Sequence, residues 1–137
     1  MDTLNSSGRQ AGESIQIEGV DTEQGLFNCN NNMDAYREVL DSFLEDADTN
    51  MAEMKRFLEK PAKPWNREEL QRFSRAVHAV KGVSAIIGAK TLSKRAADLE
   101  TAAKAGVISG DFPGFFTDYS AMAKNIQSVL KAKDSSG

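Results

Sequence analysis

Histidine, cysteine and tryptophan each occur only once in this chain of 137 residues, and what is scarce excludes several classes of protein. The single cysteine, Cys29, excludes an internal disulfide framework and fits a reducing compartment. No apolar run approaches the roughly 20 residues of a transmembrane helix, and the N-terminus lacks the basic and then apolar layout of a secretory signal. A formal net charge of -3 gives no reason to expect nucleic-acid binding. We therefore expect a soluble, cytoplasmic protein.

The sequence also lacks the motifs of several enzyme classes. It has no Gly-rich phosphate loop and no kinase motif, so we do not expect it to use ATP itself. A di-metal helical bundle needs Glu-x-x-His pairs on two helices, whereas Arg75 stands three residues before the only histidine, His78. We therefore expect neither an enzyme nor a metal site nor a cofactor in this chain.

Apolar residues recur at three- and four-residue steps in four long segments, and none shows the alternation typical of a strand. The predicted helices run from about residue 33 to 59, from the cap Asn66 to about 87, from after Gly88 to before Gly106, and from Asp111 to about 130. This pattern predicts an all-α fold, an antiparallel four-helix bundle.

A short helix is predicted before the first long one and would cap one end of the bundle. Asp21 is its predicted N-cap and Gly25 its end, and Leu26 and Phe27 would pack this segment onto the domain. The bundle domain is expected over residues 15–132. Residues 1–14 are polar and without periodicity, so we predict a flexible tail or linker there, and residues 133–137 are predicted as a flexible tail.

The only histidine lies on the polar face of the second long helix. At about 100° per residue, His78 points nearly opposite to an apolar stripe that is expected to face the core. This stripe consists of Phe73, Ala76, Val77, Val80, Ser84 and Ile87. The face of His78 carries polar, cationic or very small residues, which are Gln71, Ser74, Arg75, Lys81, Gly82 and Ala85. The imidazole is therefore predicted to be exposed.

Gly82 and Lys81 distinguish this histidine from an incidental surface residue. A glycine inside a helix costs about 1 kcal/mol relative to alanine, and Gly82 lies one turn after His78 on the same face. The missing side chain leaves space for close approach, and Lys81 adds a flexible ammonium. Such an arrangement favours a nucleophile that receives an anionic group such as phosphoryl.

The residues around His78 also carry a family resemblance. The chain resembles histidine-containing phosphotransfer (HPt) domains in the run His78-Ala-Val-Lys-Gly-Val-Ser84, followed by Gly88-Ala89, Leu92 and Leu99-Glu100. HPt domains are helical modules that relay phosphoryl groups between receiver-domain aspartates in multistep two-component signalling. The resemblance extends from about residue 17 to 130. It departs from the family pattern at Val83, where a small residue is frequent, and at Ile86, where a polar residue is common, so partner preference is affected more than chemistry.

The resemblance implies that His78 accepts a phosphoryl group from an aspartyl phosphate and passes it to another receiver. Lys81 would screen the charge of this group, and Gly82 would keep the approach open. The candidate partner-binding residues are Gln71, Ser74, Arg75, Ala85 and Ile86. The expected partners are response-regulator receiver domains and a hybrid sensor histidine kinase, with Mg²⁺ held by the receiver. No nucleic acid or membrane contact is expected, and the domain is expected to be a monomer.

Two other functions fit the same sequence. The chain can be a helical adaptor that binds a receiver domain and never carries phosphate, in which case His78, Lys81 and Gly82 only contribute to docking. It can also be the phospho-accepting domain of a chemotaxis-type kinase. A further basic group, Lys90, Lys94 and Arg95, is equally compatible with an acidic partner and with an ordinary surface.

Overall fold

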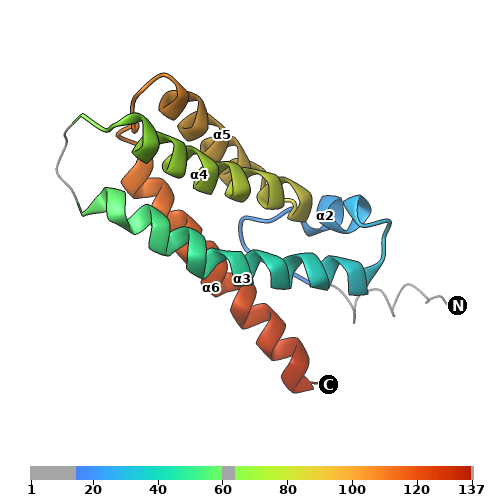
Figure 1. Ribbon diagram of the computed structural model, residues 1–137. Helices are drawn as coiled ribbons and strands as arrows, with labels where there is room; N and C mark the ends of the chain where they lie inside the picture. Colours follow the sequence, from blue (N-terminus) through green and yellow to red (C-terminus); the bar gives the residue numbers. More distant parts are fainter. Residues whose placement is uncertain (1–14, 60–63, 137) are drawn as a thin grey trace, which may run out of the picture.

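The computed structural model describes residues 15–59 and 64–136, and this part of the chain contains five helices and no strand. The helices are α2 (Thr22–Asn28), α3 (Met33–Leu58), α4 (Arg67–Ile87), α5 (Lys90–Lys104) and α6 (Phe112–Ser136). The four long helices alternate in direction, and α4 and α5 run side by side above α3 and α6 (Figure 1). The predicted antiparallel four-helix bundle is therefore confirmed.

The structure tests the predicted end of the domain at the C-terminus but not the predicted tail at the N-terminus. The predicted N-terminal tail, residues 1–14, lies outside the described residues. At the other end, α6 continues to Ser136, past residue 132, where the sequence analysis ended the domain. In Figure 1 the C-terminal part of α6 extends beyond the other helices.

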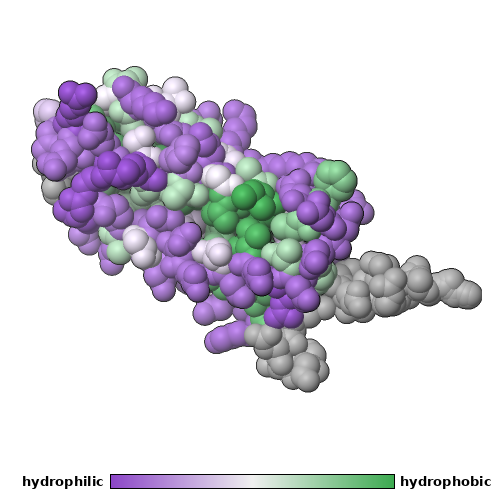
Figure 2. Space-filling view, turned by 45° about the vertical axis from the view of Figure 1, so that its right-hand side comes forward, coloured by the Kyte–Doolittle hydropathy of each residue, from purple (hydrophilic) through white to green (hydrophobic). Residues whose placement is uncertain are grey.

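The core is rich in aromatic side chains that meet edge to face. Phe73 of α4 contacts Phe112 of α6 with ring centroids 4.8 Å apart, and Phe43 of α3 contacts Tyr119 at 5.5 Å. Phe112 and Phe115 are buried at the start of α6, whereas the neighbouring Phe116 is half-buried. The face in Figure 2 is mostly hydrophilic, with a hydrophobic patch near its middle.

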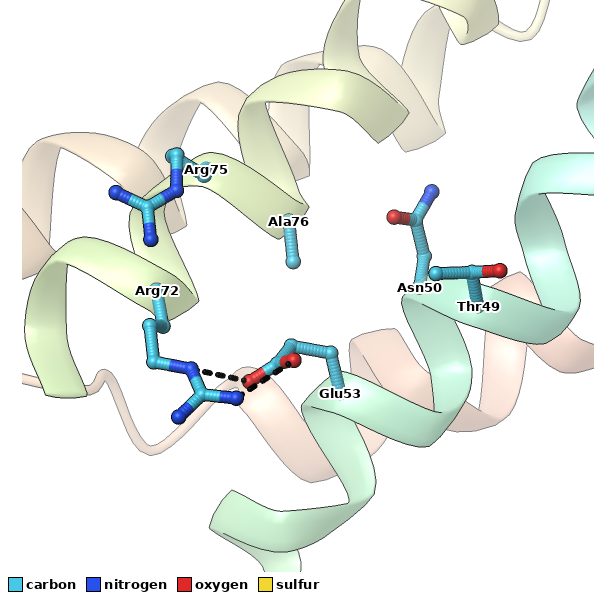
Figure 3. Close-up of a pocket in the computed structure, with 6 residues that line it drawn as sticks. All are labelled: Thr49, Asn50, Glu53, Arg72, Arg75 and Ala76. Carbon is cyan, nitrogen blue, oxygen red and sulfur yellow. Dashed lines mark hydrogen bonds and ion pairs between the residues drawn. The ribbon is translucent and has the colours of Figure 1, made fainter.

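Polar side chains also connect α3 to α4. Glu53 of α3 accepts a hydrogen bond from the guanidinium of Arg72 at 3.3 Å, and the Nε atom of Arg72 lies 3.1 Å from the second carboxylate oxygen (Figure 3). Asn50, one turn away on α3, donates to the hydroxyl of Tyr119 at 3.3 Å. Because a bidentate ion pair constrains orientation as well as distance, this contact helps to hold α4 against α3.

The short helix α2 packs against the C-terminal end of α4, and two predictions about it are wrong. Gly25 does not end the helix but lies buried inside it. The position requires glycine, because a Cβ atom there would be 2.2 Å from the carbonyl oxygen of Ile87. Phe27 is not packed onto the domain but is 65% exposed, whereas Leu26 is partly buried against the core. The helix therefore approaches α4 through its glycine, and Phe27 is on its outer side.

Gly88 follows the last residue of α4, as expected from the sequence, and it also lets the backbone of Asp21 approach closely. Its φ of 97° is left-handed, and its carbonyl accepts a hydrogen bond from the backbone amide of Asp21 at 2.8 Å. The tyrosine hydroxyl of Tyr36 donates to the carbonyl of Ile87 at 2.8 Å, and Asn28 donates to that of Ile86 at 3.1 Å. The last carbonyls of α4 are thus satisfied by α2, α3 and the chain before α2.

Candidate functional site

The N-terminus of α4 sets the orientation of its polar face. Asn66 is the N-cap, as predicted, and it forms a capping box with Glu69. Each side chain accepts a hydrogen bond from the backbone amide of the other residue, at 2.8 and 3.0 Å. All six residues of the predicted apolar stripe are buried. The side chain of His78 is 64% exposed. The prediction that the imidazole faces away from the core is confirmed.

Among the described residues, the polar partner of His78 comes from the neighbouring helix. The Nδ1 atom of His78 lies 2.8 Å from Oε2 of Glu100 on α5. Glu100 is only 7% exposed, so α5 presents a buried carboxylate to an exposed imidazole. An ionised carboxylate can only accept hydrogen bonds. In the neutral imidazole, Nδ1 therefore carries the hydrogen, and Nε2 keeps its lone pair.

Two lysines complete the surroundings of Glu100. The ammonium of Lys81 lies 2.7 Å from Oε1, and that of Lys104, one turn further along α5, lies 3.5 Å from Oε2. Burial by itself would raise the pKa of Glu100, but hydrogen bonds from Lys81 and His78 outweigh it and lower the pKa below its ordinary value of 4.5. Two ammonium groups around one carboxylate leave a net positive charge beside the imidazole, which favours the approach of an anionic group.

Lys81 is held by contacts with α5 at both its side chain and its backbone. Its ammonium contacts Glu100, and its backbone carbonyl accepts a hydrogen bond from the hydroxyl of Ser93 at 2.9 Å. The sequence analysis described Lys81 as a flexible ammonium near the imidazole. The structure instead positions it through Glu100, which His78 and Lys81 share.

Gly82 leaves open space on the same face of α4. A Cβ atom built at this position would meet no atom within 4 Å. The glycine is therefore not required for packing against another helix. Because it lies one turn after His78, its missing side chain keeps the surface beside the imidazole low.

The candidate partner-binding residues lie on both sides of His78 along α4. Gln71, Arg75, Ala85 and Ile86 are exposed, and Ser74 is half-buried. Ile86 is 44% exposed and belongs to the three exposed large hydrophobic residues of the described chain, together with Phe27 and Val107. Val83 is half-buried against the core. Gln71, Ser74 and Arg75 line an open groove between α4 and the C-terminal end of α5.

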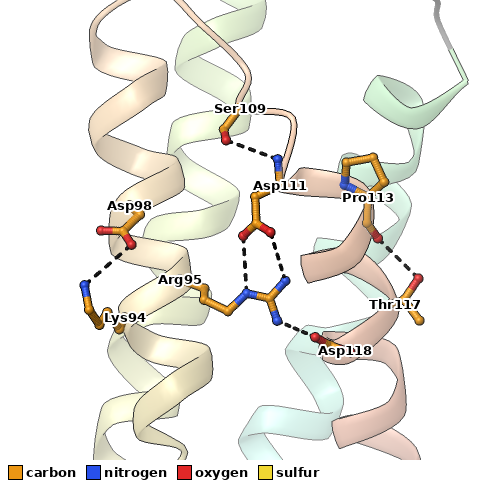
Figure 4. A network of polar contacts seen from close by, with 8 residues as sticks. All are labelled: Lys94, Arg95, Asp98, Ser109, Asp111, Pro113, Thr117 and Asp118. Carbon is orange, nitrogen blue, oxygen red and sulfur yellow. Dashed lines mark hydrogen bonds and ion pairs between the residues drawn. The ribbon is translucent and has the colours of Figure 1, made fainter.

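The basic group at the start of α5 is neutralised by acidic neighbours. Arg95 contacts Asp118 of α6 and lies 3.3 Å from Asp111, and so connects α5 to the start of α6 (Figure 4). Lys94 lies 3.6 Å from Asp98, and Lys90 lies 3.2 Å from the α2 cap Asp21. Of the two interpretations that the sequence left open, these pairs favour an ordinary surface with a structural role for Arg95.

The sequence analysis did not assign Glu100 or Lys104 to the site. One signal was available, because Glu100 directly follows the core residue Leu99 and lies four residues after the buried Ala96. An acidic residue at the edge of a buried stripe requires a partner, since an unpaired buried carboxylate is costly. The local sequence pattern does not predict which helix supplies that partner.

The comparisons with known proteins identify the family. The model of the family described as the Hpt domain matches residues 38–133, which is more than half of the chain. The chain therefore belongs to the Hpt domain family, whose members carry phosphoryl groups on histidine in two-component phosphorelays and interact with receiver domains. No curated protein and no solved structure matched the chain. Within the described residues, no helix has the length and apolar character needed to cross a membrane.

Proposed function

We propose that His78 is the phosphorylated residue of this Hpt domain, accepting a phosphoryl group from a receiver-domain aspartyl phosphate and passing it to another receiver. The observation that carries this proposal is the exposed imidazole whose Nδ1 atom is hydrogen-bonded to the buried carboxylate of Glu100. This geometry leaves the lone pair of Nε2 as the nucleophile.

The transfer needs no oxidant and no cofactor held by this chain. The lone pair of Nε2 forms a bond to phosphorus, the phosphorus–oxygen bond to the receiver aspartate breaks, and the carboxylate leaves with its electron pair. The imidazole ring gains positive charge as the P–N bond forms. Glu100, 2.8 Å from Nδ1, stabilises that charge and is a positioning residue. The second transfer reverses these bond changes on another receiver.

Lys81 and Lys104 lie around Glu100 and would offset the charge of the phosphoryl oxygens. Lys81 is the closer of the two to Glu100 and is on the same helix as His78. Gly82 would let the receiver surface come close to the imidazole. By analogy with the family, Mg²⁺ and the acidic residues that hold it belong to the receiver.

The experiment is incubation with a panel of radiolabelled, phosphorylated receiver domains, followed by mapping of the label. We expect the label on His78 alone, with the acid lability and base stability of a P–N bond. His78→Gln should fold, because the replaced side chain is exposed, but it should take no label. Lys94→Gln, an exposed change elsewhere on the surface, is the matched control and should be labelled normally. Label that persists on His78→Gln would refute the assignment, and tight receiver binding without any label would favour the adaptor function.

A further inference from the structure

A groove with positive charge at its rim extends from the phosphotransfer site toward the N-terminus of α4. It lies between α4 and the C-terminal end of α5 and has a volume of about 700 Å³. Leu70 and Ala103 contribute apolar surface, and Arg67, Arg75 and Lys104 contribute three cations. No carboxylate is among the described residues that line it.

Two cations of this groove, Arg67 and Arg75, differ from the other basic residues near the site, whereas the third, Lys104, contacts Glu100. Lys90, Lys94 and Arg95 each have an acidic partner. Arg67 and Arg75 are exposed, and neither forms an ion pair within residues 15–59 and 64–136. Their charges are therefore available to a ligand, whereas those of the basic group on α5 are largely compensated.

The groove is continuous with the site of the proposed transfer. Ser74 and Arg75 lie four and three residues before His78 on the same helix, and Lys104 lies 3.5 Å from the Glu100 carboxylate that contacts the imidazole. A protein that covers His78 closely enough to exchange a phosphoryl group therefore also covers at least the near end of the groove.

We infer that this groove binds an acidic segment of the receiver domain that exchanges phosphate with His78. The inference rests on the proposed function and names the chemistry of the partner surface. Charge complementarity carries it, because the lining holds three cations and no carboxylate, and two of these cations, Arg67 and Arg75, have no ion pair among the described residues. Such a lining matches a segment rich in Asp and Glu. The apolar floor would take up the aliphatic part of such a segment.

A substitution of Arg67 can test docking of the receiver without a direct effect on the phosphoryl transfer step. It lies eleven residues before His78 on α4, about 16 Å along the helix axis at about 1.5 Å per residue, so its side chain acts on docking and not on the phosphoryl group. Arg67→Glu is expected to fold, because an acidic residue in the first turn of a helix is favoured by the helix dipole. Lys124→Glu, at an exposed position on α6, changes the net charge equally and is the matched control.

The test uses the receiver domain that labels His78 fastest in the panel described above. For Arg67→Glu we expect the receiver concentration that gives half of the maximal transfer rate to rise about tenfold, with the saturating rate unchanged. The same concentration should depend less on salt than it does for the unmodified chain. Phosphoramidate, a small donor that needs no docking surface, should label both charge variants equally.

Two outcomes would overturn the inference, and they differ from failure of the proposed function. One is an equal shift in Arg67→Glu and Lys124→Glu, which would mean that only net charge matters. The other is a change confined to the saturating rate. If no receiver labels His78 of the unmodified chain, the proposed function fails first, and the inference fails with it.

Discussion

The imidazole of His78 and the carboxylate of Glu100 form a hydrogen-bonded pair that joins α4 to α5, with Nδ1 and Oε2 2.8 Å apart. One member of the pair is exposed and the other is buried. The exposed member is thus free to react while the buried member holds its orientation. The carboxylate of Glu100 also brings Lys81 and Lys104 close to His78, since both ammonium groups contact it.

The first prediction concerns the tautomer of His78. At about pH 8.5, where an ordinary imidazole is neutral, the ¹⁵N spectrum should show the hydrogen mainly on Nδ1. Glu100→Ala should shift the population toward hydrogen on Nε2 and slow transfer, because the acceptor is lost. Glu100→Gln keeps an acceptor oxygen and should restore the tautomer. An Nδ1-protonated spectrum in Glu100→Ala would contradict the positioning role.

The second prediction is a pH dependence of stability. The lowered pKa of Glu100 means that its ionised form stabilises the folded state. This contribution is fully present above the ordinary pKa of 4.5 and is lost as the pH falls through the lower pKa of the folded state. Urea titrations should therefore show Glu100→Gln less stable than the unmodified chain near pH 7, with the difference shrinking below about pH 4.5. Glu45→Gln, at an exposed position, is the control, and a difference independent of pH would contradict the prediction.

The third prediction separates stability from function at Gly82. Because a Cβ atom there meets nothing, Gly82→Gln should melt at an equal or higher temperature, with a gain of up to about 1 kcal/mol from helix propensity. The longer side chain lies one turn from His78, so transfer from a receiver should slow by about tenfold or more. Ala121→Gln, an exposed change on α6, should leave transfer unchanged. Undiminished transfer in a stable Gly82→Gln would show that the site needs no clearance.

The fourth prediction uses the contrast between two helical glycines. Gly25→Ala places a Cβ atom 2.2 Å from the Ile87 carbonyl oxygen and 2.5 Å from the ring of Tyr36, so α2 must move away from α4. We expect a loss of about 1–3 kcal/mol, or loss of hydrogen-exchange protection confined to α2. Gly82→Ala is the matched control and should stabilise the chain. If Gly25→Ala leaves the stability of the chain and the hydrogen-exchange protection of α2 unchanged, the close packing of α2 is refuted.

Much of α4 was predictable because its signals are local. The capping box of Asn66 and Glu69 fixes where the helix begins, and the helical period then fixes which residues are buried and that His78 is exposed. Gly88 ends the helix for a local reason too, since its left-handed φ is strained for residues with a Cβ atom. The sequence by itself therefore determined the helix, its rotation and the exposure of the histidine.

The partner of His78 was decided by the tertiary structure. Glu100 lies 22 residues away on another helix, and it meets the imidazole only because α4 and α5 pack at one particular axial register. Gly25 is a similar case. Glycine often marks the end of a helix, but Gly25 lies inside α2, where the backbone of α4 is too close to leave room for a side chain. Periodicity specifies the faces of single helices, whereas the contact between two faces depends on register and crossing angle, which are set by packing of the whole core.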